Sequence, residues 1–557
     1  MFDGIETCEK GLGLPAVVRS LDFRRIEALP RRRWWDADAE QLEQVCQAAT
    51  DYLKRSGGTM KLRPIQAAAL QELAQWKGLF GPVPVGEGKT LITLLAPLAV
   101  DAERPLLLLP AQLRDQTRLK VLPEMLPHWK LPARLDIISY EELSLEKNAK
   151  MLERLSPDLI ICDEVHYLKN PRSGRTRRVS RYMKAHPDTI FVGLSGTITT
   201  HSLMDYWHII QWALKPHRAP MPMQYLEAKE WALALDERVV DLDRRGPGAL
   251  MRFAEPGETA RQGYRRRLVE TPGVVTTKHE RLGTSLVLRR RGVSLPPAVK
   301  EVIDRLHSTW ETPDGRIVKE AVDLWRLTRE MVCGFYYRWD PEPPLDWMHA
   351  RQAWAAYVRE ILRTNQRGLD TELQVWGECA RMQRPPPAWS DWVAAKDTFK
   401  PNSVPTWLSD YLVDDVGEWL DTNDGIAWVE HRAFGARLAG KSFQYYGAGD
   451  SRILEGAGPV AASVAAHSTG KNLQQWSRNL VVCPPSGGKR WEQLLGRTHR
   501  PGQLEDEVLC DVYLHHQALE DAFKAALADA VYIEETLGQP QRLLYSAKTF
   551  TLEEARW

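Results

Sequence analysis

Short, uninterrupted apolar runs that end in polar or glycine-rich turns recur in two separate blocks of the chain. The first block contains PLLLLP (105–110), DLIICDE (158–164) and IFVGLSGT (190–197), and the second contains GIAWVE (425–430), SVAAH (463–467) and NLVVCPP (479–485). Such runs, separated by helical segments, are typical of parallel strands that are buried on both faces of a sheet. The pattern predicts an α/β fold with two parallel sheets.

Between the two blocks the pattern changes to helical periodicity with many aromatic side chains. Residues 301–420 contain ten of the 21 tryptophans, and proline-rich breaks interrupt this region. The stretch MHARQAWAAYVREILRTN (348–365) has apolar positions at helical spacing, which predicts an amphipathic helix. We expect a mainly helical insertion whose tryptophans pack in a core; stacking on nucleic-acid bases is the alternative.

These changes of pattern divide the chain into four segments. We expect a helical lead-in over 1–55, a first α/β domain over 56–216, the tryptophan-rich insertion over 217–410, and a second α/β domain with a C-terminal tail over 411–557. A length of 557 residues accommodates such a division, since domains commonly span roughly 100–200 residues.

Composition narrows the class of protein without identifying it. The net charge is +1, so any nucleic-acid binding must come from local basic patches. The seven cysteines form no CxxC pair, which gives no zinc spacing, and their odd number argues against a disulfide framework. Charged residues interrupt the most apolar stretch, 91–110, and no leader pattern precedes the first domain. We therefore expect a soluble, cytoplasmic protein with no membrane contact.

The stretch VPVGEGKT has the features of a phosphate-binding loop. Glycines at 86 and 88 allow backbone N–H groups to turn toward phosphate oxygens, and Gly86, Glu87, Gly88, Lys89 and Thr90 precede a helix candidate. Lys89 would contact the β- and γ-phosphates of ATP, and the Thr90 hydroxyl would bind Mg²⁺. Val83 occupies a position where the full motif has glycine. The alternative is a glycine-rich turn beside a surface lysine.

Two carboxylates follow the strand DLIICDE. Asp163 and Glu164 lie at its polar end, and His166 follows closely. One carboxylate of such a pair can hold Mg²⁺, while the other orients the attacking water or accepts its proton. We assign Asp163 to Mg²⁺ together with Thr90, and Glu164 to the water.

Two arginines near the C-terminus lack an obvious acidic partner. Arg497 and Arg500 are three positions apart in WEQLLGRTHRPGQ (491–503), which would place both on one face of a helix. An arginine that stabilises the charge on a transferring phosphoryl group is worth roughly 10³–10⁵ in turnover. If the two domains face each other across the nucleotide, these arginines complete the site. The alternative is a basic helix cap on the surface.

Taken together, the motifs resemble the superfamily 2 helicase core and, more narrowly, the Swi/Snf-type double-stranded DNA translocases. The resemblance covers about residues 60–215 and 420–520 and rests on LRPIQ (62–66), DEVHYLKN (163–170), GLSGT (193–197), TGKNLQ (469–474) and QLLGRTHRPGQ (493–503). It implies two RecA-like lobes, ATP and Mg²⁺ as cofactors, and DNA-dependent ATP hydrolysis.

The resemblance also implies roles for further residues. Arg63 and Gln66 match an adenine-recognising element that has isoleucine here in place of tyrosine, and Gln493 belongs to the motif of the arginine finger. The residues that would couple hydrolysis to domain movement are His166, Ser195, Gly196 and Thr197. Those that would touch the nucleic-acid backbone are Gly470, Lys471 and Asn472.

A run of basic residues follows the carboxylate strand. RSGRTRRVSRYMK (172–184) contains Arg175, Arg177 and Arg178 and no acidic residue. Because phosphate contacts dominate affinity for nucleic acid, we expect these arginines to bind it, with a solvated helix face as the alternative. The family likeness favours DNA, duplex more than single-stranded, and a monomeric motor with replication or repair partners.

Three other functions stay open at this point. The chain could be a P-loop kinase or metabolic ATPase, a nucleic-acid-binding scaffold with a vestigial motor, or an RNA-directed helicase. In its compact size the chain is similar to the helicases of bacteriophage replication clusters. This resemblance implies the host cytoplasm as its location.

Overall fold

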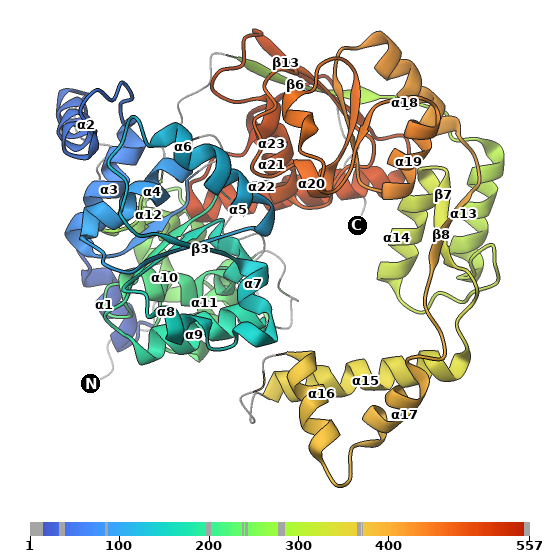
Figure 1. Ribbon diagram of the computed structural model, residues 1–557, viewed down its shortest axis with the longest axis horizontal. Helices are drawn as coiled ribbons and strands as arrows, with labels where there is room; N and C mark the ends of the chain where they lie inside the picture. Colours follow the sequence, from blue (N-terminus) through green and yellow to red (C-terminus); the bar gives the residue numbers. More distant parts are fainter. Residues whose placement is uncertain are drawn as a thin grey trace.

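The computed structural model describes residues 15–32, 39–83, 87–196, 202–236, 239, 243–276, 284–364, 369 and 371–550. Figure 1 shows two α/β units, with the N-terminal part of the chain in one and the C-terminal part in the other, and a helical projection that extends from the second unit. The predicted α/β fold with parallel sheets is confirmed. Within the described residues, no helix combines the length and apolar character needed to cross a bilayer.

The first sheet has five parallel strands in the order β1-β5-β4-β2-β3. They are β1 (Leu79–Gly81), β2 (Pro105–Leu109), β3 (Asp136–Ser139), β4 (Leu159–Asp163) and β5 (Ile190–Leu194). Strands β2 and β4 are buried along their whole length, which explains their continuous apolar sequences.

Twelve α-helices of the first unit surround this sheet. They are α1 (Leu21–Ala28), α2 (Ala39–Leu53), α3 (Pro64–Trp76), α4 (Lys89–Val100), α5 (Ala111–Gln116), α6 (Leu122–Met125), α7 (Tyr140–Ser144), α8 (Met151–Leu155), α9 (Gly174–Ala185), α10 (Trp207–Leu214), α11 (Tyr225–Leu235) and α12 (Ala260–Val269), counted over the described part of the chain. The buried residues form two cores, one around Trp231 and the other around Trp129.

The second sheet has seven parallel strands in the order β10-β11-β9-β12-β13-β6-β14. They are β6 (Ser285–Arg291), β9 (Ile426–Val429), β10 (Tyr445–Tyr446), β11 (Val460–Ser463), β12 (Arg478–Val481), β13 (Glu507–Tyr513) and β14 (Ala547–Lys548). Its helices are α18 (Tyr411–Thr422), α19 (Arg432–Gly440), α20 (Val464–His467), α21 (Gly488–Thr498), α22 (Gln517–Leu537) and α23 (Arg542–Tyr545).

The segment 217–410, predicted to be one helical insertion, divides among three places. Its first part packs in the core of the first unit, where Ala219 and Val274 are buried. Strand β6 lies inside the second sheet, between β13 and β14. The remainder packs partly against the second sheet and partly projects from the second unit. The prediction of a single insertion is therefore wrong. A pattern of helices and aromatic residues does not reveal which neighbouring core each helix joins.

This remainder is built from helices and a two-stranded antiparallel ribbon. Its elements are α13 (Pro297–Thr309), α14 (Ala321–Val332), β7 (Phe335–Trp339), α15 (Leu345–Thr364), α16 (Glu372–Arg381), α17 (Pro387–Ala395) and β8 (Ser403–Trp407). We call α15, α16 and α17 the arm. The predicted amphipathic helix is confirmed as α15, whose buried residues include Trp354 and Val358. Trp376, Trp389 and Trp392 pack against this face, so the tryptophans serve as core.

Helix α22 connects the second unit to the first. Tyr532 donates a hydrogen bond to Asp236 (2.8 Å), and Arg261 of α12 pairs with Glu535 (2.9 Å). Leu537, at the end of α22, is buried in the first unit's core. Helix α22 therefore contributes residues to the cores of both units.

Candidate active site between the two sheets

The residues of the expected phosphate loop lie at the start of α4, which follows β1. Gly88 has a left-handed backbone (φ 73°) and caps the helix, which begins at Lys89. The left-handed backbone favours glycine at this position, and a β-carbon there would lie 2.2 Å from Nε2 of Gln66, which would have to move. Lys89 is buried and donates through Nζ to the carbonyl of Val83 (3.1 Å). A helix N-terminus with an ammonium group beside it favours anions.

The expected adenine-recognising residues surround this loop. Gln66 donates through Nε2 to the carbonyl of Gly88 (3.1 Å), and its Oε1 accepts from the backbone N–H of Arg63 (2.9 Å). Arg63 also pairs loosely with Glu87 (3.8 Å). Gln66 thus stabilises the conformation of the loop, and its expected contact with adenine stays a prediction. Gly86 lies outside the described residues.

The two carboxylates stand at the end of β4. Asp163 is the last residue of the strand, and Glu164 has a positive φ of 57°, a strained conformation that proteins retain mainly at functional sites. Burial is the main cause that raises the pKa of Asp163 to about 7, and repulsion by Glu164 adds to it. The charge of Lys89 acts in the opposite direction. Oδ1 of Asp163 is buried and accepts no hydrogen bond. A buried carboxylate oxygen without a partner is suited to a cation.

Glu164, His166 and Ser195 form a closed triangle of hydrogen bonds. Ser195 Oγ donates to Glu164 Oε2 (2.9 Å), and Nδ1 of His166 lies 2.8 Å from Ser195 Oγ and 3.1 Å from Glu164 Oε2. Because Ser195 gives its proton to the carboxylate, Nδ1 must carry one. Burial raises the pKa of Glu164, but the bond with His166 and the charge of Lys89 outweigh it and lower the pKa overall.

The triangle also reaches the second unit. The backbone carbonyl of Ser195 accepts a hydrogen bond from Gln539 Nε2 (3.3 Å), and Gln539 follows α22 closely. Burial, then the charge of Lys489, lowers the pKa of His166 to about 4, so its ring is neutral at pH 7. Gly196 follows Ser195 at the limit of the described segment, and Thr197 lies outside it.

Arg497 and Arg500 come from the end of α21. Only Arg497 is helical, and Arg500 lies beyond the helix end, so the expectation that both share one helical face is wrong. Arg497 donates to the carbonyls of Lys471 (3.0 Å) and Gln493 (2.9 Å), and Arg500 donates to the side chain of Asn472. Burial is the main cause that lowers the pKa of Arg497 to about 9 and of Arg500 to about 10. Both arginines remain charged at neutral pH.

One cavity of about 140 Å³ brings these groups together. The first unit contributes the start of α4 and the end of β4, and the second contributes the end of α21 and the loop before β12. The lining residues include Gly88, Lys89, Thr90, Asp163, Glu164, Gly470, Asn472, Arg497 and Arg500. Three cationic side chains and two carboxylates therefore face the same space, an arrangement suited to a polyanion bound with a divalent cation.

Gly470 and Asn472, which were expected to touch the nucleic-acid backbone together with Lys471, line this cavity. Lys471 donates to Asp450 O (3.1 Å) and lies 2.6 Å from His467 Nδ1. A β-carbon at Gly470 would be 2.0 Å from Leu113 of the first unit, so glycine permits the close approach of the two units here. The expected nucleic-acid contacts of these residues stay a prediction.

Two residues of the site were missed in the sequence. Gln116 lines the cavity and donates to the carbonyl of Gly470 (3.3 Å), and no motif marks it. Lys489 is partly buried in α21, and its charge acts on both Glu164 and His166. Lys489, Gln493 and Arg497 recur every four residues, so helical periodicity could have placed all three on one face. Gln493 itself is buried.

The basic run on α9 is less exposed than expected. Arg178 is buried and donates to the carbonyls of Leu143 and Leu145 (both 2.6 Å). Arg175 donates to the carbonyl of Tyr167 (2.8 Å). Arg177 donates to the carbonyls of Leu362 and Leu369, which places the arm against α9. The burial of Arg178 argues against a phosphate contact by this side chain.

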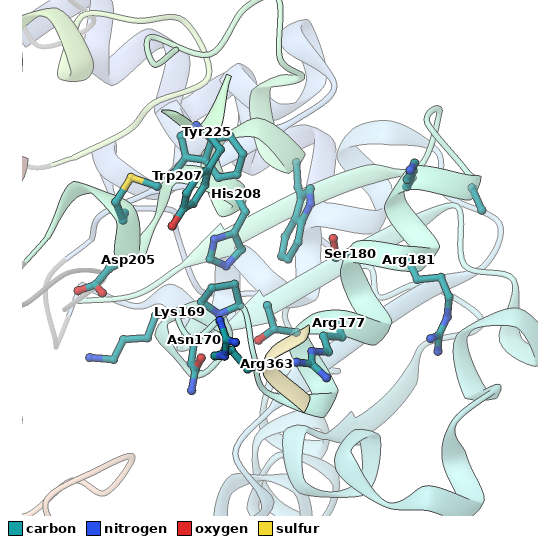
Figure 2. Close-up of a pocket in the computed structure, with 16 residues that line it drawn as sticks. Lys169, Asn170, Arg177, Ser180, Arg181, Asp205, Trp207, His208, Tyr225 and Arg363 are labelled. Atoms are coloured by element: carbon teal, nitrogen blue, oxygen red, sulfur yellow. The ribbon is translucent and has the colours of Figure 1, made fainter. Parts of the chain in front are cut away.

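A larger pocket of about 1110 Å³ lies beside α9. Figure 2 shows Lys169, Asn170 and Arg177 close to Arg363 of the arm, with the aromatic group Trp207, His208 and Tyr225 on the same wall. Arg181 and Lys184 also line it, and both are exposed. The pocket combines basic groups with aromatic rings, as surfaces for single- or double-stranded nucleic acid do.

Comparison with known proteins gives a partial similarity. Over 78 residues the chain is 33% identical to the DNA excision repair protein ERCC-6-like 2 of Mus musculus. The match covers 14% of this chain and 5% of that protein. No protein-family model matches the chain. The similarity to phage helicases stays a prediction.

Lys489 should make stability depend on pH. Burial lowers the pKa of Lys489 from 10.5 to about 7, although the charge of Glu164 opposes this shift. Between these two pH values, Lys489 therefore binds a proton in the unfolded chain and not in the folded chain. Stability should therefore rise with pH from about 7 to about 10, by at most about 1.4 kcal/mol per pH unit. Urea unfolding at several pH values should show a flatter rise for Lys489→Met. The control Lys400→Met, at an exposed position, should keep the wild-type slope; equal slopes for all three proteins would contradict the assignment.

Proposed function

We propose that this protein is an ATP-dependent DNA translocase or helicase of the superfamily 2, Swi/Snf-like class, with two RecA-like lobes built on the two parallel sheets. The observation that carries the proposal is the composite cavity, which Lys89 and Glu164 line from one sheet and Arg497 and Arg500 line from the other. A cavity that needs both units for its charges can report the state of its ligand as a change in how the units fit together.

The first unit supplies the groups for binding and for activating water. Lys89 and the N-terminus of α4 would hold the β- and γ-phosphates of ATP, and Thr90 with Asp163 would hold Mg²⁺. The partnerless Oδ1 of Asp163 supports that fit. When bound, Mg²⁺ neutralises phosphate charge and removes the penalty on the ionised form of Asp163. Glu164, whose pKa is lowered, stays ionised and orients the attacking water.

The second unit supplies charge stabilisation and the mechanical connection. Arg497 and Arg500 would stabilise the negative charge on the transferring phosphoryl group. Glu164 is also bonded to Ser195, whose carbonyl accepts from Gln539 of the second unit. A change in the bonding of Glu164 during hydrolysis would therefore reach the second unit through two hydrogen bonds. This route supports the coupling role expected for His166, Ser195 and Gly196.

DNA is the polymer that the observations favour. The partial similarity to a DNA excision repair protein supports this choice. The pocket between α9 and the arm offers Lys169, Arg181 and Lys184 for phosphates, with Trp207 and Tyr225 nearby for sugar or base contacts. We place the DNA track along this pocket.

Nucleic acid should stimulate ATP hydrolysis. We expect duplex DNA to raise the steady-state rate most, single-stranded DNA less and RNA least. Glu164→Gln should bind ATP as the wild type does and hydrolyse it at less than a tenth of the wild-type rate, because the water loses its orienting carboxylate. A rate that no polymer changes would favour a kinase or metabolic ATPase instead, and stimulation by RNA alone would favour an RNA-directed helicase.

Arg500→Ala should lower the maximal hydrolysis rate by roughly 10³-fold, since the loss of an arginine finger costs roughly 10³–10⁵. ATP affinity should change little, because the arginine acts mainly on the transition state. Arg490→Ala is the matched control, since Arg490 lies in α21, the helix that precedes Arg500, but pairs with Glu430 (2.7 Å) and is absent from the cavity lining. Equal rates for the two variants would show that Arg500 takes no part in the chemistry.

Replacing Lys169, Arg181 and Lys184 by alanine should weaken binding to duplex DNA. Each phosphate contact that is lost should reduce the slope of log affinity against log salt by roughly 0.9. The charge-matched control replaces the exposed Lys300, Arg305 and Lys319 near α13. Fluorescence anisotropy over a range of salt concentrations measures both slopes. If the control loses as much slope as the pocket variant, the track does not follow α9.

A further inference from the structure

Three side chains from distant parts of the sequence meet beside the second sheet. Cys333 directly follows α14, His431 caps the start of α19 after β9, and Cys483 follows β12. None of them lines the cavity between the two units or belongs to a predicted functional site. The two cysteines are 1% exposed and belong to the core that joins α13 and α14 to the second sheet.

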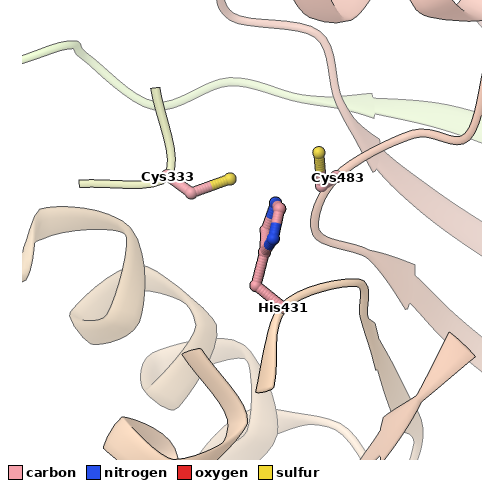
Figure 3. Close-up of side chains that lie close together, drawn as sticks. All are labelled: Cys333, His431 and Cys483. Atoms are coloured by element: carbon pink, nitrogen blue, oxygen red, sulfur yellow. The ribbon is translucent and has the colours of Figure 1, made fainter. Parts of the chain in front are cut away.

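The donor atoms of this cluster have the spacing of a metal site. One nitrogen of His431 and the two sulfurs all lie within 4.8 Å of one another. Figure 3 shows the imidazole ring between the two sulfurs, with all three side chains directed into the same space. Nε2 of His431 is buried and has no hydrogen-bond partner. A buried imidazole nitrogen without a partner is costly unless a ligand occupies the space that it faces.

We propose that Cys333, His431 and Cys483 bind one Zn²⁺ ion, with a water molecule as the fourth ligand. Thiolate and imidazole are the ligands that zinc prefers, and Zn–S bonds of about 2.3 Å in a tetrahedron put two sulfurs about 3.8 Å apart. The spacing within 4.8 Å therefore needs only small side-chain adjustments. Two thiolates balance the charge of the ion, which suits a buried position.

Arg329 completes the surroundings of the site. Its Nη2 lies 3.0 Å from Sγ of Cys483 and 2.6 Å from the carbonyl of Pro484, and its guanidinium stacks on Trp325. An N–H donor to a metal-bound thiolate orients the ligand and leaves its other lone pairs for the ion. Without a metal, the same contacts would make a hydrogen-bonded cluster of thiol, imidazole and guanidinium, which is the competing interpretation.

The site would fix the base of the arm. Cys333 lies immediately before Gly334 and β7, the first strand of the ribbon that carries the arm, whereas His431 and Cys483 belong to the second unit. A metal bond between them closes long loops of chain and restrains the arm where it leaves the second sheet. The arm, which also contacts α9 of the first unit, would then move with the second unit. The zinc proposal itself does not depend on the proposed function.

The test is the zinc content of the full chain, purified without an affinity tag that binds metal. Elemental analysis by mass spectrometry should find about one zinc ion per wild-type chain. The variants Cys333→Ser, Cys483→Ser and His431→Asn should each lose most of this zinc. His431→Cys should retain zinc, because it restores three ligands. Cys379→Ser is the control, since Cys379 is equally buried but lies in the arm, and it should keep the wild-type content.

A second measurement covers variants that fold poorly. Wild-type protein whose zinc has been exchanged for Co²⁺ should show the thiolate-to-cobalt charge-transfer band and the strong visible absorption of a tetrahedral site. A zinc chelator should lower the Tm of the wild type and of Cys379→Ser but not of the ligand variants that fold. Metal-free wild-type protein without a cobalt spectrum would overturn the proposal. So would a Cys333–Cys483 disulfide in the native protein, or zinc that persists in every ligand variant.

Discussion

The candidate site depends on one constraint: the two units must lie close enough for the carboxylates of one unit and the guanidinium groups of the other to line the same cavity. Glu164 acts on Arg497 across the cavity, and Asp163 lies beside it at the end of β4. Burying either a carboxylate or a guanidinium group alone would be strongly unfavourable, and the nearby opposite charge offsets part of that cost. The relative position of the two units therefore affects the electrostatics of the site as well as its apolar packing.

Helix α22 maintains that position. Its last turns contact α12 and the core of the first unit, and Gln539 beyond it reaches the carbonyl of Ser195. The chain then returns to the second unit, where Arg542 pairs with the buried Glu492 of α21. The same segment thus connects the helix that presents the two arginines with the strand end that presents the two carboxylates. A displacement of either should be felt by the other, because packed interiors transmit small shifts.

Burial also decides which of the many basic residues can act on a ligand. Arg178 looks like part of a basic surface in the sequence, but its guanidinium satisfies two backbone carbonyls inside the first unit. Arg177 holds the arm through backbone carbonyls. Lys489, by contrast, belongs to no basic run in the sequence, since only Arg490 adjoins it, and yet its partly buried charge affects Glu164. Formal charge in a sequence is a weak guide to function until the solvent exposure of each group is known.

Local pattern was sufficient for several strands and for most of the candidate site. Continuous apolar runs predicted β2, β4, β5, β9 and β12, but SVAAH (463–467), which was expected as a strand, continues from the last residue of β11 into α20. Glycine spacing predicted the turn before α4, and the polar end of β4 predicted Asp163 and Glu164, because these features depend on short-range backbone geometry and on burial of both sheet faces. Even the pairing of the two blocks across one cavity was predicted, since arginines without local partners needed an anion.

Tertiary structure alone decided what distant segments share. Strand β6 joins the second sheet from within a region that looked helical, and Gly470 faces Leu113 because the units approach closely there. The seven cysteines have no zinc spacing in the sequence, yet two of them meet His431 in the core. The physical reason is the same in each case. Periodicity and motif spacing describe neighbours along the chain, whereas packing selects neighbours in space, and no residue carries a local signal of which distant partner it will meet.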